Sequence, residues 1–511
     1  MSTMPVIIIG AGPVGLSASM ALSRQGIDNI VIEKHPSTSI HPKARGVNVR
    51  TMELCRIWGV EQQIRQSELP VTARRFLWMN HVKGEVLGDV SFITEQENIS
   101  PTEPCLLSQD IFEKELLTCL KSQKQAQVLF NTRVINIEQD NQLVSCELEN
   151  LIENTRTKIH CQYLIAADGA NSFVRKKLNI SMDGIPILGT HVSVYCETDL
   201  SPWLAGKPFA VLAFTDIEQM GRVMMAVDLK RRWIISKRVA DANEVLSNEA
   251  GIQLVRAAVD EPELAVNVIN ISKWEMAALN AQQYRHGRIF LCGDAAHRIP
   301  PTGGMGMNTG IGDAHNLAWK IAYVLQGYAN QTLLDSYEQE RKPLAQTTMD
   351  WSVVNANRLR AIFQSLIEGN HHAFRDGLKE QTKHINHLGL DIGFIYQSNA
   401  LYPSSRETVP FDPNTYNNKT MVGKRAPHCW LSYNNRTIST IDLFEKNYVL
   451  LAGENCNVEK LKLPILEQYP KTTLIIGKDL QILNQDFYSC YQLTKEQAVL
   501  VRPDGHIAWI S

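Results

Sequence analysis

Apolar and polar residues alternate in blocks at the start of the chain. Residues 6–9 are consecutive apolar residues, the pattern of a strand buried in a parallel sheet. A glycine-rich turn follows, and apolar positions at helical spacing then continue to Gly26. Residues 29–32 are a second apolar run that ends at Glu33. This opening therefore predicts a strand, a helix and a second, parallel strand.

The pattern changes twice in the middle of the chain. Residues 72–100 indicate mixed β structure without a long helix, and residues 181–275 indicate a second β-rich stretch. The periodicity predicts helices at 110–120, at 307–326 and from Asp335 to about 380. The predicted strands lie at 128–130, 142–147, 163–166, 191–196, 209–214, 222–227, 232–235 and 288–292.

The end of the chain has its own pattern. A break rich in Pro, Asn, Ser and Gly at 399–428 predicts a linker. Apolar runs at 448–451, 473–476 and 497–502 follow this break. They predict a separate, small α/β unit.

The composition of the 511 residues is that of an ordinary globular protein. Apolar residues make up 44% and charged residues 20%, and 51 Lys and Arg against 53 Asp and Glu leave a net charge of −2. This balance gives no electrostatic reason to expect nucleic acid or an anionic membrane as a partner. No run approaches the ~18 consecutive apolar residues of a membrane span, and the start lacks the basic leader of a secretory signal. We expect a cytoplasmic protein.

The ten cysteines are scattered, and no CxxC occurs anywhere in the chain. Disulfide scaffolds and zinc ribbons need closer, paired spacing. We therefore expect reduced thiols in the core, as in a cytoplasmic protein, and no metal site.

The turn after the first predicted strand carries a dinucleotide motif. Gly10-Ala-Gly-Pro-Val-Gly15 lies between a strand and a helix, the context in which GxGxxG binds a pyrophosphate. Gly10 permits the tight turn, Gly12 lets the phosphates approach the backbone, and Gly15 allows close helix–strand packing. Glu33 is placed to accept hydrogen bonds from an adenosine ribose. This half of the site fits FAD and NAD equally.

Two further motifs follow predicted strands. Asp168-Gly-Ala-Asn-Ser172 comes after the strand at 163–166, and on its own it is a common turn. Cys292-Gly-Asp294 ends another strand, and a loop rich in Pro and Gly then leads to the long helix at 307–326. An aspartate at a strand end can accept hydrogen bonds from polyol hydroxyls, and the N-terminus of the helix can stabilise negative charge on a reduced isoalloxazine ring. A nicotinamide dinucleotide has no ribityl chain, so this pairing favours FAD.

The segments GAGPVG, ADGANSFVR and CGDAAHRIPPTGGMGMNTGIGDAHNLAWK resemble the three fingerprints of the FAD-dependent aromatic hydroxylases, the group A flavoprotein monooxygenases. The ending LVRPDGHIAW resembles the longer members, which include phenol, pentachlorophenol and polyketide hydroxylases. The resemblance implies an α/β fold with a Rossmann-like FAD-binding domain, a β-sheet substrate domain and a C-terminal thioredoxin-like domain. Because this last domain lacks CxxC, we expect no disulfide exchange there.

The resemblance also implies site residues. Asp294 would contact the ribityl chain, and the backbone of 306–308 would contact the pyrimidine end of the flavin. Arg45 lies in the segment that this family uses when its flavin moves, and Arg45 and His297 are candidate catalytic residues. The cofactor-binding set is Gly10, Gly12, Pro13, Val14, Gly15, Glu33, Lys34, Arg45, Gln109, Asp168, Gly169, Gly293, Asp294, Pro301, Gly304, Gly306, Met307 and Asn308.

In this family NADPH or NADH reduces the FAD, O2 adds to give a C4a-hydroperoxide, and its terminal oxygen is transferred to the substrate. The resemblance thus implies a monooxygenase that hydroxylates an aromatic, phenolic or polyketide-like substrate, and a homodimer is one candidate assembly. The substrate would lie between the flavin and residues 181–275. The candidate wall residues are Tyr195, Phe214, Met224, Met225 and Trp233, although residues of these types more often belong to ordinary core or sheet packing.

Two alternatives stay open at this point. One is a flavin monooxygenase that builds or inactivates a bulky antibiotic, and the other is a non-catalytic FAD protein that acts as a sensor or interaction module. The expected domains are 1–71 with 101–180 and 276–400 for FAD, 72–100 with 181–275 for the substrate, and 415–511 for the last unit.

Overall fold

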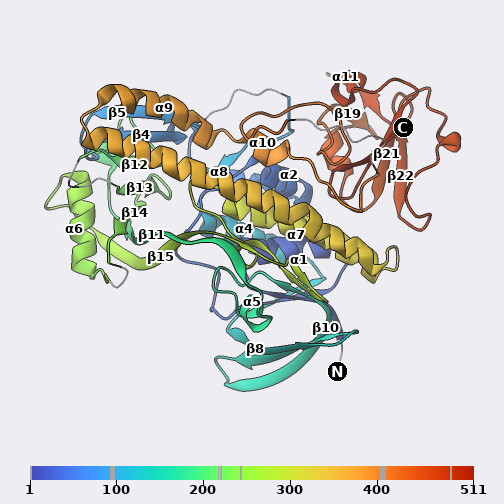
Figure 1. The fold of residues 1–511 in the computed structure, drawn as a ribbon, viewed down its shortest axis with the longest axis horizontal. Coiled ribbons are helices and arrows are strands. Elements are labelled where there is room, and N and C mark those ends of the chain that lie inside the picture. The colour runs from blue at the N-terminus through green and yellow to red at the C-terminus, as the bar shows by residue number, and fades with distance from the viewer. Residues whose placement is uncertain are drawn as a thin grey trace.

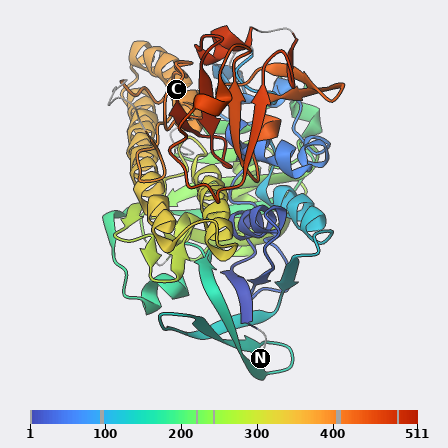
Figure 2. The same cartoon turned by 90° about the vertical axis from the view of Figure 1, so that its right-hand side faces the viewer.

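The chain folds into three units, each built around its own sheet (Figures 1 and 2). The computed structural model describes residues 3–92, 98–216, 218, 221–241, 244–402, 410–483 and 486–511.

Parallel strands form the centre of the first unit, in the order β17-β10-β1-β2-β7. The apolar run at 6–9 lies in this sheet and is buried, as a central strand covered on both faces requires. Antiparallel partners β16, β9 and β8 extend the sheet. The strands are β1 (Thr3–Ile9), β2 (Asn29–Ile32), β7 (Ala126–Leu129), β8 (Thr132–Gln139), β9 (Val144–Asn150), β10 (Thr155–Ala166), β16 (Arg285–His286) and β17 (Ile289–Leu291).

Three helices supply most of the helical packing in this unit: α1 (Pro13–Arg24), α4 (Gln109–Leu120) and α7 (Gly306–Leu325). Helix α1 packs against both of the others. The predicted helices at 110–120 and 307–326 therefore exist almost as expected. Helix α2 (Val49–Trp58), which the pattern did not predict, packs beside α7 and begins at Asn48, whose side chain accepts a hydrogen bond from Thr51 N–H.

The second unit is a mostly antiparallel sheet in the order β18-β15-β11-β14-β13-β12-β4-β5. Helix α6 (Asn248–Val259) covers one face of it. The sequence pattern missed this helix inside a β-rich stretch. The strands are β4 (Arg75–Met79), β5 (Val86–Ser91), β11 (Met182–Glu197), β12 (Val211–Phe214), β13 (Val223–Ala226), β14 (Arg232–Val239), β15 (Asn267–Ala281) and β18 (His297–Arg298). The second unit was expected to end at residue 275, but β15 continues to Ala281. The sheet also includes β18, His297–Arg298, which follows the Asp294 loop.

The long helix α8 (Asp335–Ile367) crosses the front of the molecule and connects the first two units (Figure 1). Helix α9 (His371–Ile385) packs beside α8 and over β5, and α10 (Leu388–Ile392) follows. The predicted helical stretch from 335 to about 380 is therefore two helices, separated at Gly369, whose φ of 65° favours glycine.

The C-terminal unit holds a mixed sheet in the order β22-β21-β24-β25 and a smaller sheet, β20-β19-β23. Within the described residues its helix is limited to α11 (Phe487–Tyr491) and short 3-10 turns. The strands are β19 (Trp430–Tyr433), β20 (Arg436–Ser439), β21 (Tyr448–Ala452), β22 (Lys471–Ile475), β23 (Gln481–Ile482), β24 (Ala498–Val501) and β25 (Ile507–Ile510). The three apolar runs predicted as strands lie in β21, β22 and β24.

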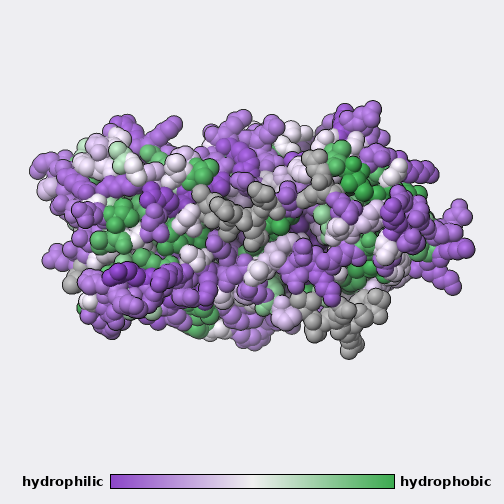
Figure 3. Space-filling model, turned by 90° about the horizontal axis from the view of Figure 1, so that it is seen from above, coloured by the Kyte–Doolittle hydropathy of each residue, from purple (hydrophilic) through white to green (hydrophobic). Residues whose placement is uncertain are grey.

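The surface is largely hydrophilic, and the cysteines are unpaired, as the composition and the scattered cysteine positions led us to expect. On the face in Figure 3, apolar residues lie in small groups among hydrophilic ones, as on a water-facing surface. Among the described residues, no helix is both long and apolar enough to cross a bilayer. All ten cysteines are free.

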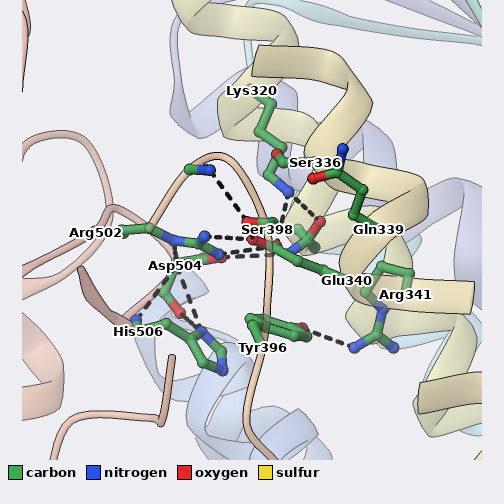
Figure 4. A network of polar contacts seen from close by, with 12 residues as sticks. Lys320, Ser336, Gln339, Glu340, Arg341, Tyr396, Ser398, Arg502, Asp504 and His506 are labelled. Carbon is green, nitrogen blue, oxygen red and sulfur yellow. Dashed lines mark hydrogen bonds and ion pairs between the residues drawn. The ribbon is translucent and has the colours of Figure 1, made fainter. Parts of the chain in front are cut away.

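Buried charges join the C-terminal unit to α7 and α8 (Figure 4). The guanidinium of Arg502 donates to both carboxylate oxygens of Glu340, at 2.5 and 3.0 Å, and also bonds Asp504. Lys320 Nζ donates to Glu340 at 2.8 Å. Arg502, Glu340 and Lys320 have no exposed side-chain surface. Each charge in this group is paired, and this pairing offsets the free-energy cost of removing the charges from water.

We expect Arg502→Met to destabilise the protein by about 3 kcal/mol, because Glu340 and Asp504 would each lose a buried partner. Urea unfolding followed by tryptophan fluorescence measures this, since Arg502 lies 5.3 Å from the ring of Trp319. Arg436→Met, at an exposed position of the same unit, is the matched control. Equal unfolding curves for the two variants would contradict the assignment.

Candidate active site

Three loops meet at the carboxyl edge of the parallel sheet. Ile9 pairs with Ala166, and Ala166 with Leu291, so these three strands end at the same level. The ladder continues for one more step, because Ala167 N–H donates to Ile9 O and Cys292 N–H donates to Ala166 O, both at 2.9 Å. The motifs beginning at 10, 168 and 293 therefore lie side by side, where open α/β sheets bind their ligands.

The first loop has the shape that a pyrophosphate needs. A Cβ atom on Gly10 would lie 2.3 Å from Ala167 O, and one on Gly15 would lie 1.9 Å from Gly10 O. A Cβ on Gly12 would meet nothing within 4 Å, so this position faces open space. Helix α1 starts there without a side-chain cap. Its free N–H groups can bind an anion.

Glu33 closes this loop from the next strand. Its Oε2 accepts a hydrogen bond from Ala11 N–H and its Oε1 accepts one from His35 N–H, both at 2.9 Å. The carboxylate is thus fixed beside the glycine turn, as expected for a group that binds ribose hydroxyls. Lys34 is exposed.

The second loop holds an incompletely satisfied acid. Asp168 Oδ2 accepts a hydrogen bond from Val174 N–H at 3.1 Å, while Oδ1 is buried and has no hydrogen-bond partner among the described residues. Burial raises the pKa of Asp168. Arg175, whose role the sequence did not indicate, donates to Ala170 O and Ala295 O at 2.9 Å. It thereby ties the second loop to the third.

The third loop presents Asp294 and depends on Asp313 behind it. Asp294 is exposed at the end of β17. Asp313, fully buried in α7, accepts hydrogen bonds from Gly293 N–H at 3.1 Å, His297 Nε2 at 2.6 Å and Arg341 Nε at 2.7 Å. Burial opposes ionisation of Asp313, but His297 and Arg341 outweigh it and keep its pKa below the usual value. His297 is itself fully buried, so we interpret it as a support of the loop and no longer as a proton-transfer group.

The start of α7 is held against the segment after Arg45. Asn308 Oδ1 accepts a hydrogen bond from Asn48 N–H at 3.0 Å, and Asn308 Nδ2 donates to Gly46 O at 2.9 Å. Gly304, with φ of 67°, has open space where a Cβ would lie. The backbone of 304–308 is therefore ordered next to 46–48, while the exposed Pro301 precedes it.

Arg45 carries a charge without a partner. Its Nη1 is buried without a hydrogen bond, and within the described part of the chain no carboxylate pairs with it. Desolvation lowers the pKa of Arg45 to about 10. Gln109 holds the backbone beside it: Gln109 Oε1 accepts from Ala44 N–H at 3.1 Å, and Gln109 N–H donates to Ala44 O at 2.8 Å. The guanidinium is thus available to a ligand.

A buried carboxyl that the sequence did not indicate lies under this segment. Glu113 is 1% exposed and accepts hydrogen bonds from Gln109 Nε2 at 2.6 Å and Ser39 N–H at 2.9 Å. Burial raises the pKa of Glu113 to about 7. Its charge state therefore changes near neutral pH, directly beneath residues 39–45.

The five candidate wall residues divide between the two faces of the second sheet. Phe214, Met224 and Trp233 are fully buried in the core beneath α6, so they are packing residues here. The strand register puts Tyr195 and Met225 on the opposite face. We keep only these two as candidate wall residues.

This opposite face is turned toward the Arg45 segment. His41 Nδ1 hydrogen-bonds Asn270 at 3.0 Å, and its ring contacts Tyr195 edge-on at 5.6 Å. His191 stacks on Trp274 on the same face, with ring centroids 4.6 Å apart. The 39–45 segment therefore lies over this face of the sheet, which belongs to the stretch expected to hold the substrate.

These features fit FAD better than a nicotinamide dinucleotide alone. The open Gly12 position and the unpartnered Asp168 oxygen lie on loops at the carboxyl edge of the sheet, and the segment after Arg45 is held against the start of α7. The exposed Asp294 and the ordered start of α7 are the groups that we expect to form a second half-site for a longer cofactor.

Comparisons with known proteins agree with this geometry. Residues 3–352 match the family model described as "FAD binding domain", and residues 419–511 match "Aromatic-ring hydroxylase, C-terminal". The chain is 32% identical to tetracenomycin B2 monooxygenase-dioxygenase of Streptomyces olivaceus, over 99% of this chain and 95% of that relative.

Two solved structures are similar over the full length. The flavin-dependent monooxygenase PieE, in complex with FAD and substrate, matches with a TM-score of 0.90 and 26% identity, over 100% of this chain and 96% of PieE. Aklavinone-11 hydroxylase with FAD and aklavinone matches with a TM-score of 0.85 and 29% identity, at the same coverage.

The chain therefore belongs to the FAD-dependent aromatic-ring hydroxylases. It is an NAD(P)H-dependent flavoprotein monooxygenase that hydroxylates an aromatic compound. The resemblance and fold inferred from the sequence are confirmed, and the sensor alternative is set aside. The roles of the individual site residues stay predictions.

We expect Asp294→Ala to weaken FAD retention about tenfold, because the charged carboxylate would no longer accept a hydrogen bond from a polyol hydroxyl of the cofactor. The ratio of flavin absorbance to protein after gel filtration measures this. The matched control is Asp28→Ala, because Asp28 is also exposed but lies at the amino end of a strand, directly before β2. Wild-type flavin content in the Asp294 variant would contradict the role given to this carboxylate.

Glu113 predicts a pH-dependent stability. Its pKa in the folded protein, about 7, is above its ordinary value of 4.5, so the stability it contributes is full below pH 4.5 and is lost as pH rises through 7. The wild type should lose up to about 3 kcal/mol relative to Glu113→Gln between pH 4.5 and 7, and little more above pH 7. Thermal unfolding of both proteins across this range tests it. A pH-independent difference between them would refute the assignment.

Proposed function

We propose that the protein hydroxylates a planar, polycyclic aromatic substrate of the aromatic-polyketide type, with O2 as the source of oxygen. The observation that carries this proposal is the face of the second sheet opposite α6. Polar and aromatic side chains, His191, Ser193, Tyr195, Ser236 and Trp274, continue on this face across β14, β11 and β15.

The width of this face favours several fused rings over one. Neighbouring strands lie ~4.8 Å apart, so a strip from β13 to β15 is about 14 Å wide. A single phenol ring would cover only part of it. Met225 and Trp274 are half-buried and give a fused ring system apolar surfaces to contact.

The polar groups of this face can orient phenolic hydroxyls. Burial and the nearby Arg238 lower the pKa of His191 to about 4, so its imidazole is neutral at pH 7 and can accept a hydrogen bond. Tyr195 OH accepts a hydrogen bond from Arg232 at 3.3 Å, and Arg232 in turn is paired with Asp110 and Asp228. These contacts fix Tyr195 against His41.

Bound FAD would supply the redox chemistry and the activation of oxygen. The chain's own residues bind the cofactor at the three loops, hold the sheet face opposite it and exclude water. The relatives support the substrate class, since the similar structure of aklavinone-11 hydroxylase holds aklavinone together with FAD. The free thiols support a reducing, cytoplasmic location, and the homodimer stays a prediction.

Substrate-stimulated NADPH oxidation, with mass analysis of the product, tests the proposal. A tetracyclic polyketide such as aklavinone should be hydroxylated with a lower KM than single-ring phenols. If phenol is hydroxylated faster and with a lower KM than the tetracyclic substrate, the proposed substrate class is wrong, although the protein is still a hydroxylase.

We expect Trp274→Ala to raise the KM for the tetracyclic substrate about tenfold, equivalent to ~1.4 kcal/mol of lost ring contact. Phe214→Leu, on the α6 face of the same sheet, is the matched control and should leave this KM unchanged. Equal KM values in both variants would mean that the substrate does not lie on the face that carries Trp274.

A further inference from the structure

Two cysteines that are far apart in the sequence lie together in the C-terminal unit. Cys429 precedes β19 and Cys490 lies in α11, and both pack in the same apolar cluster. Each thiol shifts the pKa of the other, as neighbouring titratable groups do. The absence of CxxC concealed this pair, because the two thiols come from separate segments.

The backbone fixes their approach from both sides. Leu483 N–H, before α11, donates to Trp430 O, directly after Cys429, at 3.4 Å. Tyr491 OH, at the end of α11, donates to Pro427 O at 2.8 Å. The segment that carries Cys490 is thus attached to the chain on each side of Cys429.

The two thiols have different surroundings. Cys429 is completely buried, while Cys490 is partly exposed to solvent. The neighbouring Cys429 thiol outweighs burial and lowers the pKa of Cys490 to about 7, and Cys490 in turn raises the pKa of Cys429. One thiol is therefore an accessible nucleophile near neutral pH, and the other is a shielded neighbour.

We propose that Cys429 and Cys490 form a redox-active dithiol that hydrogen peroxide converts to a disulfide. The Cys490 thiolate attacks one peroxide oxygen and breaks the O–O bond; it becomes a sulfenic acid, and the other oxygen leaves as water once protonated. The Cys429 thiol then displaces the sulfenic oxygen as a second water and forms the S–S bond. In total, two thiols and one peroxide give one disulfide and two waters.

A second thiol pair in the chain provides an internal comparison. Cys146 and Cys161 lie on the paired strands β9 and β10, and Cys146 contributes to the raised pKa of Cys161. Both are completely buried, and burial raises the pKa of Cys161 well above its usual value. Contact alone is common to both pairs, whereas an exposed, easily ionised thiol occurs only in the pair in the C-terminal unit.

Peptide mass spectrometry of the full-length, FAD-loaded protein tests this proposal. After brief exposure to hydrogen peroxide and alkylation of the remaining thiols, we expect a peptide crosslinked through Cys429 and Cys490 and none through Cys146 and Cys161. Dithiothreitol should reverse the crosslink. If Cys490 is oxidised to sulfinic acid while Cys429 stays alkylatable, or if both pairs crosslink equally, the proposal is wrong.

Two variants separate the roles of the thiols. In Cys429→Ala, peroxide should leave a sulfenic acid on Cys490 that dimedone traps, and alkylation of Cys490 at pH 7 should slow about fivefold because its pKa rises. In Cys490→Ser, Cys429 should resist peroxide. Unchanged Cys490 alkylation in the first variant would overturn the proposed contact, and fast oxidation of Cys429 in the second would overturn its shielded role.

Discussion

The Asp313 carboxylate is the contact on which the geometry of the active site depends. It binds the backbone of Gly293 before the exposed Asp294, the imidazole of His297 and the guanidinium of Arg341. These groups belong to the third loop, to the edge strand β18 of the substrate sheet and to α8. A buried carboxylate must be paired to remain ionised, and here the groups that pair it are the parts that have to be aligned. The cost of burying the charge is thus offset by contacts that set the position of the third loop relative to the second sheet.

Contacts continue from Asp313 through Arg341 to the C-terminal unit. Arg341 Nη1 donates to Tyr396 OH at 2.8 Å, and the ring of His506 lies 4.4 Å from that of Tyr396. A small cavity of about 40 Å³ lies here, lined by residues of α2, α7, α8 and the 504–506 loop, and it has room for a few water molecules. Close by, the buried Arg502–Glu340 pair joins the last unit to α8. This explains why the RPDGH sequence near the end of the chain carries several charges and yet is buried.

The sequence predicted those parts of the fold whose signals are local. The glycine turn after β1, the strand end at Asp294 and the long α7 each follow from a few adjacent residues, and so did FAD. Helix α6 was missed because it lies among strands. The face of the sheet on which a strand residue lies was also not predicted, because it depends on the register between strands, which the sequence of one strand does not reveal. Trp233 and Tyr195 therefore looked alike in the sequence, although one lies under α6 and the other faces His41. The roles of Glu113 and Arg175 were not predicted, because each also depends on a distant partner, Ser39 for Glu113 and Ala295 for Arg175. The two thiols were not paired because they lie on separate segments.

The strand register decides which residues lie on each of the two faces of the second sheet. Side chains alternate along each strand, so the apolar core under α6, which holds Phe214, Met224 and Trp233, also fixes where Met225, Tyr195 and Trp274 point. A slip of one residue would exchange the two sets and expose the core. The core thus sets the shape of a face that it does not touch. Residues of that face, where we propose that the substrate binds, can then be replaced with little effect on the register, so one scaffold could accept different aromatic substrates without change to the three loops.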